Sequence, residues 1–185
     1  MRYTILLVIF IGVYVSATAQ KTKCDTIRWA PDVKLTWKDF NGPPDNNSSF
    51  KALTNSGMFL YQSYNDKQVT MSTGTQFFSC GSWTKAGSDS LLRHEQLHFD
   101  ISELYRRKFL KRVLDGSYNK NDHNDRINAI YDEVNKQWKK EDQKYDDETN
   151  HGIIQKKQLE WQERIKKELQ ELEPYSKPQV TIALK

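Results

Sequence analysis

The sequence has 185 residues, of which 28 are basic and 24 acidic, so its formal net charge is +4. The two signs interleave along the C-terminal half and form no basic block, which argues against a nucleic-acid partner. No second long apolar run follows the first twenty residues, so the composition excludes a further membrane span in a mature protein.

The first twenty residues, MRYTILLVIFIGVYVSATAQ, have the features of a secretory signal peptide. Arg2 supplies the positive start, residues 5–15 form the apolar run, and ATA at 17–19 provides the small residues of a cleavage site. An uncleaved membrane anchor is the alternative, but the run is short for a span of about 20 residues. We therefore predict a signal peptide over residues 1–19, a single domain over residues 20–185, and a secreted or periplasmic location.

The chain contains two cysteines, Cys24 and Cys80. In an exported protein an even pair favours one disulfide. Two unpaired, buried thiols are the alternative, because the distance between the residues decides. We predict the disulfide.

Strand-forming and turn-forming residues dominate from residue 26 to about residue 85. TIRW (26–29) and KLTW (34–37) are short strand candidates, and NGPPDNNSS (41–49) predicts a loop because of its prolines and asparagines. The runs 52–64 and 68–78 flank the turn residues NDK, which together predict a β-hairpin.

A helical period begins at about residue 88, where Ser88, Asp89 and Ser90 are candidate N-caps. Apolar residues at spacings of three and four predict a first long helix that ends at Gly116. Two more helices are predicted, one around 127–138 and one around 161–172, and the tail QVTIALK could return as an edge strand. The predicted fold class is α+β, with N-terminal antiparallel strands and a hairpin followed by three helices.

The segment HEQLH, residues 94–98, carries the clearest chemical signal. Positions i and i+4 of a helix lie on one face, so His94 and His98 can both reach one small cation. Glu95 lies about 100° further round the helix, where its carboxylate can approach a metal-activated water without binding the metal. We therefore predict His94 and His98 as zinc ligands and Glu95 as the general base of a hydrolase.

Two buried histidines without a metal are the alternative interpretation of this helix. The chain has only four histidines, however, and two of them stand in this arrangement beside Glu95. Gln96, Leu97 and Phe99 are uncharged, which suits a buried and rigid site more than a solvated helix face.

A catalytic zinc usually has three protein ligands and one open position. We rank His151 first as the third ligand, because it falls at a break between helices with carboxylates beside it. Glu148 or Asp146 comes next, and His123 comes last because its loop predicts an exposed side chain. Glu133, on the next helix, has no supporting pattern.

Two further residues have weaker signals. Tyr145 is a candidate catalytic residue that would donate a hydrogen bond to an oxyanion, although a core position continuing the stripe through Trp138 is the alternative. Asp100 follows the motif and could accept a hydrogen bond from a ligand histidine, or it could be a surface carboxylate without a role.

At these residues the chain resembles a family of bacterial proteins of unknown function that are described as predicted secreted zinc-dependent proteases. The likeness is carried by LTWKDFNG (35–42), LLRHEQLHFDI (91–101), YDDETNHG (145–152) and QLEWQERI (158–165), which extend over essentially the whole mature chain. The resemblance implies a zincin-like fold with HExxH on the first long helix, His94 and His98 as ligands, and Glu95 as a catalytic residue. His151 stands in the family's later His-Gly motif, which agrees with its first rank above.

The predicted function is therefore that of a secreted zinc metallopeptidase that hydrolyses peptide or protein substrates through a zinc-activated water. Two alternatives stay open: a non-catalytic envelope or binding module with a zincin-like fold, and a peptidoglycan amidase or peptidase. A structural zinc would be closed by a fourth protein ligand, for which Cys24 and Cys80 would be available if they were reduced. The sequence makes no prediction of the oligomeric state.

Overall fold

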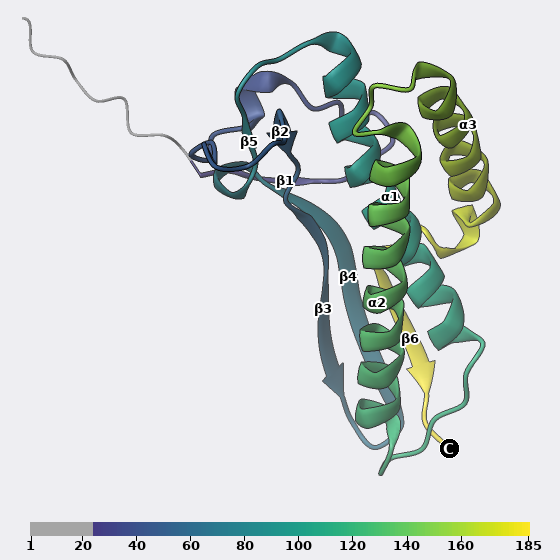
Figure 1. Cartoon of the computed structure of the whole chain (residues 1–185). Coiled ribbons are helices and arrows are strands. Elements are labelled where there is room, and N and C mark those ends of the chain that lie inside the picture. Colours follow the sequence, from purple (N-terminus) through teal and green to yellow (C-terminus); the bar gives the residue numbers. More distant parts are fainter. Residues whose placement is uncertain (1–23) are drawn as a thin grey trace, which may run out of the picture.

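A computed structural model describes residues 24–185 and has the predicted α+β architecture (Figure 1). The predicted signal peptide lies outside the described residues. The elements in chain order are β1 (Thr26–Arg28), a 3-10 turn (Trp37–Asp39), β2 (Ala52–Leu53), β3 (Ser56–Tyr64), β4 (Gln68–Phe78), a 3-10 turn (Ser79–Gly81), β5 (Trp83–Thr84), α1 (Asp89–Leu114), α2 (His123–Thr149), α3 (Gln155–Glu171), a 3-10 turn (Glu173–Tyr175) and β6 (Gln179–Ala183).

The antiparallel sheet is built around β4. The predicted hairpin is confirmed: β3 pairs with β4 along its whole length, from Ser56 opposite Phe77 to Tyr64 opposite Val69. On the other edge of β4, β1 pairs with its C-terminal part and β6 with its N-terminal part, which confirms the predicted return of the tail as a strand. Burial alternates along β4 with a period of two, so one face of the sheet is covered.

Helix α1 provides that cover and is the central element of the fold. It packs against β3 and β4 and also contacts α2 and α3 (Figure 1). Its start agrees with the prediction, because the Ser88 hydroxyl accepts a hydrogen bond from the Leu91 amide. The main core lies where α1 faces the sheet and the other helices, and it includes the fully buried Ile101, Phe109 and Leu110.

A buried group of charges ties α1 to its surroundings. Glu103 accepts hydrogen bonds from Arg106 and Arg107, and all three side chains are buried. Thr75 of β4 also donates to Glu103, and Arg107 donates to the Leu169 carbonyl of α3. Because a buried charge is tolerated only with partners, these contacts specify how α1 sits against β4 and α3.

Cys24 and Cys80 form the predicted disulfide, with their Cα atoms 5.1 Å apart. The bond joins the segment before β1 to the 3-10 turn after β4. Between residues 24 and 185, none of the helices is both long enough and apolar enough to cross a membrane.

Two local predictions were wrong. KLTW is not a strand: Trp37–Asp39 form a 3-10 turn, because the Asp39 carboxylate accepts hydrogen bonds from the Thr36 amide and hydroxyl and closes a capping box. His123 does not lie exposed in a loop, since α2 begins at this residue and its side chain is buried beside Tyr64.

Candidate metal and catalytic site

His94 and His98 point the same ring atom toward each other, as the i, i+4 spacing predicts. Their Nε2 atoms are 3.2 Å apart. Asp146 of α2 brings a carboxylate oxygen to the same place, with Oδ1 3.0 Å from the His94 Nε2 and 3.2 Å from the His98 Nε2. These residues form a group whose possible ligand atoms all lie within 4.8 Å of one another. The two imidazoles are almost fully buried, so the group lies at the inner end of the site.

The opposite nitrogen of each ring has its own partner. The His98 Nδ1 is 2.7 Å from the Asp142 Oδ1, and the His94 Nδ1 is 3.2 Å from the Gln158 Oε1. With a proton on each Nδ1, both rings donate outward and both Nε2 atoms present lone pairs inward. The inner group is then three hydrogen-bond acceptors without a donor among them, which is the chemistry of a cation site.

The distances fit a tetrahedral zinc ion. Ligand atoms about 2.0–2.1 Å from such an ion lie about 3.3 Å from one another, which follows from the tetrahedral angle. The three edges between His94, His98 and Asp146 measure 3.0–3.2 Å. Two imidazoles and one carboxylate are also a donor set found in zinc hydrolases. The residues present therefore fit the metal.

Without a cation the same atoms act as an ion-paired cluster. Burial opposes charge on His98, but the nearby Asp142 and Asp146 carboxylates outweigh it and hold the pKa of His98 well above its ordinary value. Burial likewise opposes charge on Asp146, but hydrogen bonds from His94 and His98 lower the pKa of this carboxyl. The two pKa shifts follow from the close pairing of imidazoles with carboxylates, because each partner favours the charged form of the other.

Glu95 faces the same cavity as the histidine pair. The cavity has a volume of about 730 Å³ and is lined by β2, the first turns of α1 and the end of α2. Glu95 is only 3% exposed, and its Oε2 accepts a hydrogen bond of 2.7 Å from the Thr54 hydroxyl. Thr54 follows β2 directly, so the short strand orients the predicted general base.

Tyr145 is placed behind the histidines. It is fully buried and does not line the cavity. Its ring stacks on His94 with centroids 4.6 Å apart, and its hydroxyl donates to the Gln158 Oε1 at 2.7 Å. This placement does not support the predicted oxyanion donor, because the hydroxyl is engaged away from the cavity; it agrees with the alternative of a core aromatic.

His151 lies at the rim of the site. Its side chain is 39% exposed, its Nδ1 is 3.3 Å from the Asp146 Oδ1, and its ring rests on Phe50. Asn150 and His151 both have a positive φ and Gly152 follows with φ of 79°, so α2 ends in a left-handed turn. A Cβ on Gly152 would come within 2.9 Å of the His94 Cβ, so the turn packs on the site only with glycine there.

The structure thus brings Asp146, ranked second by sequence, into the inner group, whereas His151 is outside that group of mutually close atoms. The other candidates are engaged elsewhere. Glu148 accepts from Trp161, and the exposed Glu133 pairs with Arg112. Asp100 accepts from Trp29 and Gln96 and not from a ligand histidine, so its predicted supporting role at the metal is wrong.

Sequence reasoning missed Asp142, Gln158 and Thr54. A signal for the first existed, because Asp142 and Asp146 are also an i, i+4 pair and so share one face of α2. This pair faces the pair His94 and His98 on α1. Gln158 and Thr54 had no such signal, since an amide and a hydroxyl of this kind are common on any helix or loop.

Comparison with known proteins gives one match. Residues 80–152 match a family described as a bacterial protein of unknown function (DUF922). No significant match was found among curated proteins or among solved structures. The matched segment contains α1, α2 and the turn after α2, and it includes the inner group and Glu95. The chain is therefore similar to a bacterial family of unknown function over the segment that carries the candidate site.

Proposed function

We propose that the protein is a secreted zinc-dependent hydrolase that cleaves peptide bonds. One observation carries the proposal: the Nε2 atoms of His94 and His98 and the Oδ1 atom of Asp146 lie 3.0–3.2 Å from one another, in a cavity that Glu95 also lines. Two imidazoles and a carboxylate at this spacing match the ligand set of a zinc site, and the neighbouring carboxylate of Glu95 can serve as a base.

His94, His98 and Asp146 would hold the ion, with Asp146 in place of His151 as the third ligand. A bound zinc ion supplies Lewis-acid activation of water and of the substrate carbonyl. Glu95 accepts a proton from the attacking water and returns it to the leaving amine. Thr54 keeps the Glu95 carboxylate oriented toward the cavity through its hydrogen bond to Oε2.

Asp142 and Gln158 act on the ligands and not on the substrate. Each accepts from the Nδ1 of one histidine and so keeps its ring orientation and tautomer. Tyr145 supports this arrangement, because it packs against both rings and bonds to Gln158. The proposal therefore treats Tyr145 as a positioning residue.

A closed structural zinc site is the rival reading, in which the protein is a non-catalytic envelope module. Cys24 and Cys80 were the spare ligands for such a site, and their disulfide removes them. Three protein ligands leave one position for water or substrate, which favours catalysis. The disulfide also favours an oxidising compartment, in line with secretion or the periplasm.

The test is metal analysis and hydrolysis with three forms of the chain: wild type, Glu95→Gln and Glu160→Gln. Glu160 is an exposed residue of α3 paired with Lys157, so it controls for the loss of one carboxylate. We expect about one zinc per chain in all three forms. Casein cleavage should be lost only in Glu95→Gln. Zinc in all three forms with equal activity would refute the assignment of Glu95 as the base. Iron as the retained metal would refute the proposal of a zinc hydrolase.

The peptidoglycan alternative has the same site chemistry and differs in substrate. Casein, gelatin and muropeptides should be incubated side by side with wild type and Glu95→Gln. Cleavage of proteins by wild type alone supports the peptidase. Cleavage of muropeptides alone would refute the peptidase proposal and support a cell-wall hydrolase.

A further inference from the structure

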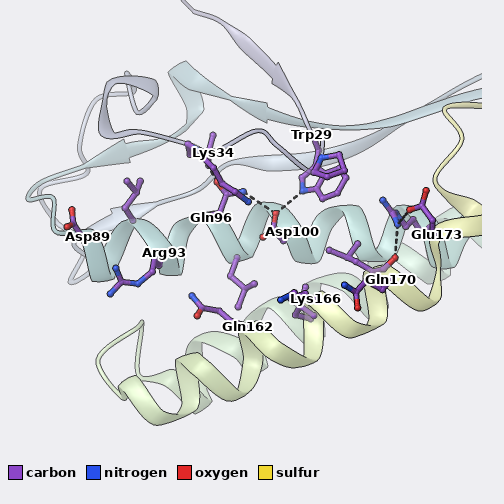
Figure 2. A pocket seen from close by; sticks show the side chains of 17 residues that line it. Trp29, Lys34, Asp89, Arg93, Gln96, Asp100, Gln162, Lys166, Gln170 and Glu173 are labelled. Carbon is purple, nitrogen blue, oxygen red and sulfur yellow. Dashed lines mark hydrogen bonds and ion pairs between the residues drawn. The ribbon is translucent and has the colours of Figure 1, made fainter.

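A second cavity, here called the α1–α3 groove, lies along α1 (Figure 2). Its volume is about 760 Å³, and its walls are α1, α3 and the segment 29–35. No lining residue is shared with the metal cavity. The groove is therefore a separate surface that the proposed hydrolysis does not use.

The floor of the groove is apolar. Leu92 and Leu97 of α1 and Ile165 and Leu169 of α3 line it. Trp29 also lines the groove, and its ring centroid lies 5.3 Å from the Arg107 guanidinium carbon. An apolar floor of this extent with a few polar groups around it is typical of a binding site.

Three cations line the groove, and each comes from a different wall: Lys34 from the segment 29–35, Arg93 from α1 and Lys166 from α3 (Figure 2). All three are exposed, and within residues 24–185 none of them has a hydrogen bond or ion pair. Their charges are therefore available to an occupant.

The acidic residues of the groove do not balance these charges. Glu173 is paired with Arg107, and one oxygen of Asp100 accepts hydrogen bonds from Trp29 and Gln96. Burial raises the pKa of Asp100 against the effect of these bonds and of the nearby Lys34 charge. The remaining acid, Asp89, lies in the first turn of α1, where the helix dipole favours a negative charge. Four cations against three carboxylates leave the lining with a formal charge of +1, and the three cations without a partner are the ones that an occupant can contact.

Two amides complete the lining. Gln162 and Gln170 of α3 line the groove, and neither side chain makes a hydrogen bond in the described part of the chain. A primary amide offers both donors and acceptors. It therefore matches the backbone of a peptide better than an acyl chain.

We infer that the α1–α3 groove binds an acidic polypeptide segment that also carries apolar side chains. From Asp89 to Arg107, α1 extends about 27 Å, which is the length of about eight residues in an extended chain. Cations on three walls suit an occupant with several negative charges spread along it. A single-headed amphiphile would use one of them.

The test is fluorescence anisotropy with a labelled ten-residue peptide of five Glu and five Leu. Peptides with Lys or Gln in place of Glu are the charge controls. The full mature chain with Glu95→Gln is used, so that cleavage does not compete with binding. We expect the acidic peptide to bind, its affinity to fall with salt, and the basic peptide not to bind.

Lys166→Glu should weaken binding of the acidic peptide by about tenfold, because one attraction is replaced by a repulsion. Lys167→Glu is the matched control: Lys167 is the next residue of α3, is 76% exposed and does not line the groove. Circular dichroism melting should be alike for both, since both side chains are on the surface. Equal binding of the acidic and basic peptides, equal loss in both variants, or binding of dodecanoate without binding of the peptide would each overturn the inference.

Discussion

Asp142 is the residue whose role rests most on the structure, and the substitution Asp142→Asn tests it. Its Oδ1 is 2.7 Å from the His98 Nδ1, a length expected for a charge-assisted hydrogen bond. Asparagine keeps the size and an accepting oxygen but removes the charge. Loss of such a partner typically lowers metal affinity 10–100-fold. This is about 1.4–2.7 kcal/mol of binding free energy.

The assay is competition for zinc between the protein and a chromophoric chelator at pH 7. Asp147→Asn is the control, because Asp147 is exposed on α2 and bonds to Gln143, away from the site. We expect the control to bind zinc like wild type. Unchanged affinity in Asp142→Asn would refute the idea that this carboxylate orients His98. A loss far above 100-fold would show that Asp142 is itself a ligand.

Two further outcomes follow from the electrostatics and the disulfide. Asp142 and Asp146 raise the pKa of His98 against the effect of burial. Protonated His98 therefore stabilises the metal-free protein fully below about pH 6.5, and this contribution is lost as the pH rises through the raised pKa. The melting midpoint of EDTA-treated protein should therefore fall from pH 6.5 to 9, while that of zinc-loaded protein rises because protons no longer compete with the metal; parallel curves would contradict the site. Replacing Cys24 and Cys80 by serine opens a loop with a sequence separation of 56, which should cost about 4 kcal/mol in urea unfolding, and an unchanged midpoint would show that the bond does not constrain the unfolded chain.

Much of the fold can be read from local pattern. The hairpin followed from two strand-like runs around NDK, and the start of α1 followed from Ser88 and the apolar period after it. The strand predicted for KLTW does not form, because Asp39, three residues after Thr36, caps a turn that competes with a strand. The place of β6 beside β4 joins residues more than a hundred positions apart. Such a pairing depends on the whole core and not on a local pattern.

The candidate site divides in the same way. His94 and His98 lie on one helix, and their spacing correctly predicted that both rings share one face. The third acceptor comes from α2, and the choice between Asp146 and His151 depends on how that helix ends. The left-handed turn at residues 150–152 leaves His151 at the rim, while Asp146, one turn earlier, still faces α1. Backbone conformation at two non-glycine residues is not encoded by any simple spacing.

The possible metal ligands of the inner group belong to two different helices, the imidazoles to α1 and the carboxylate to α2. An ion held there would cross-link the two helices, so the supply of metal would also govern how long the chain survives among proteases. In zinc-starved cells the last turns of α2 should be the first segment to be clipped. The abundance of the protein would then report the availability of the metal.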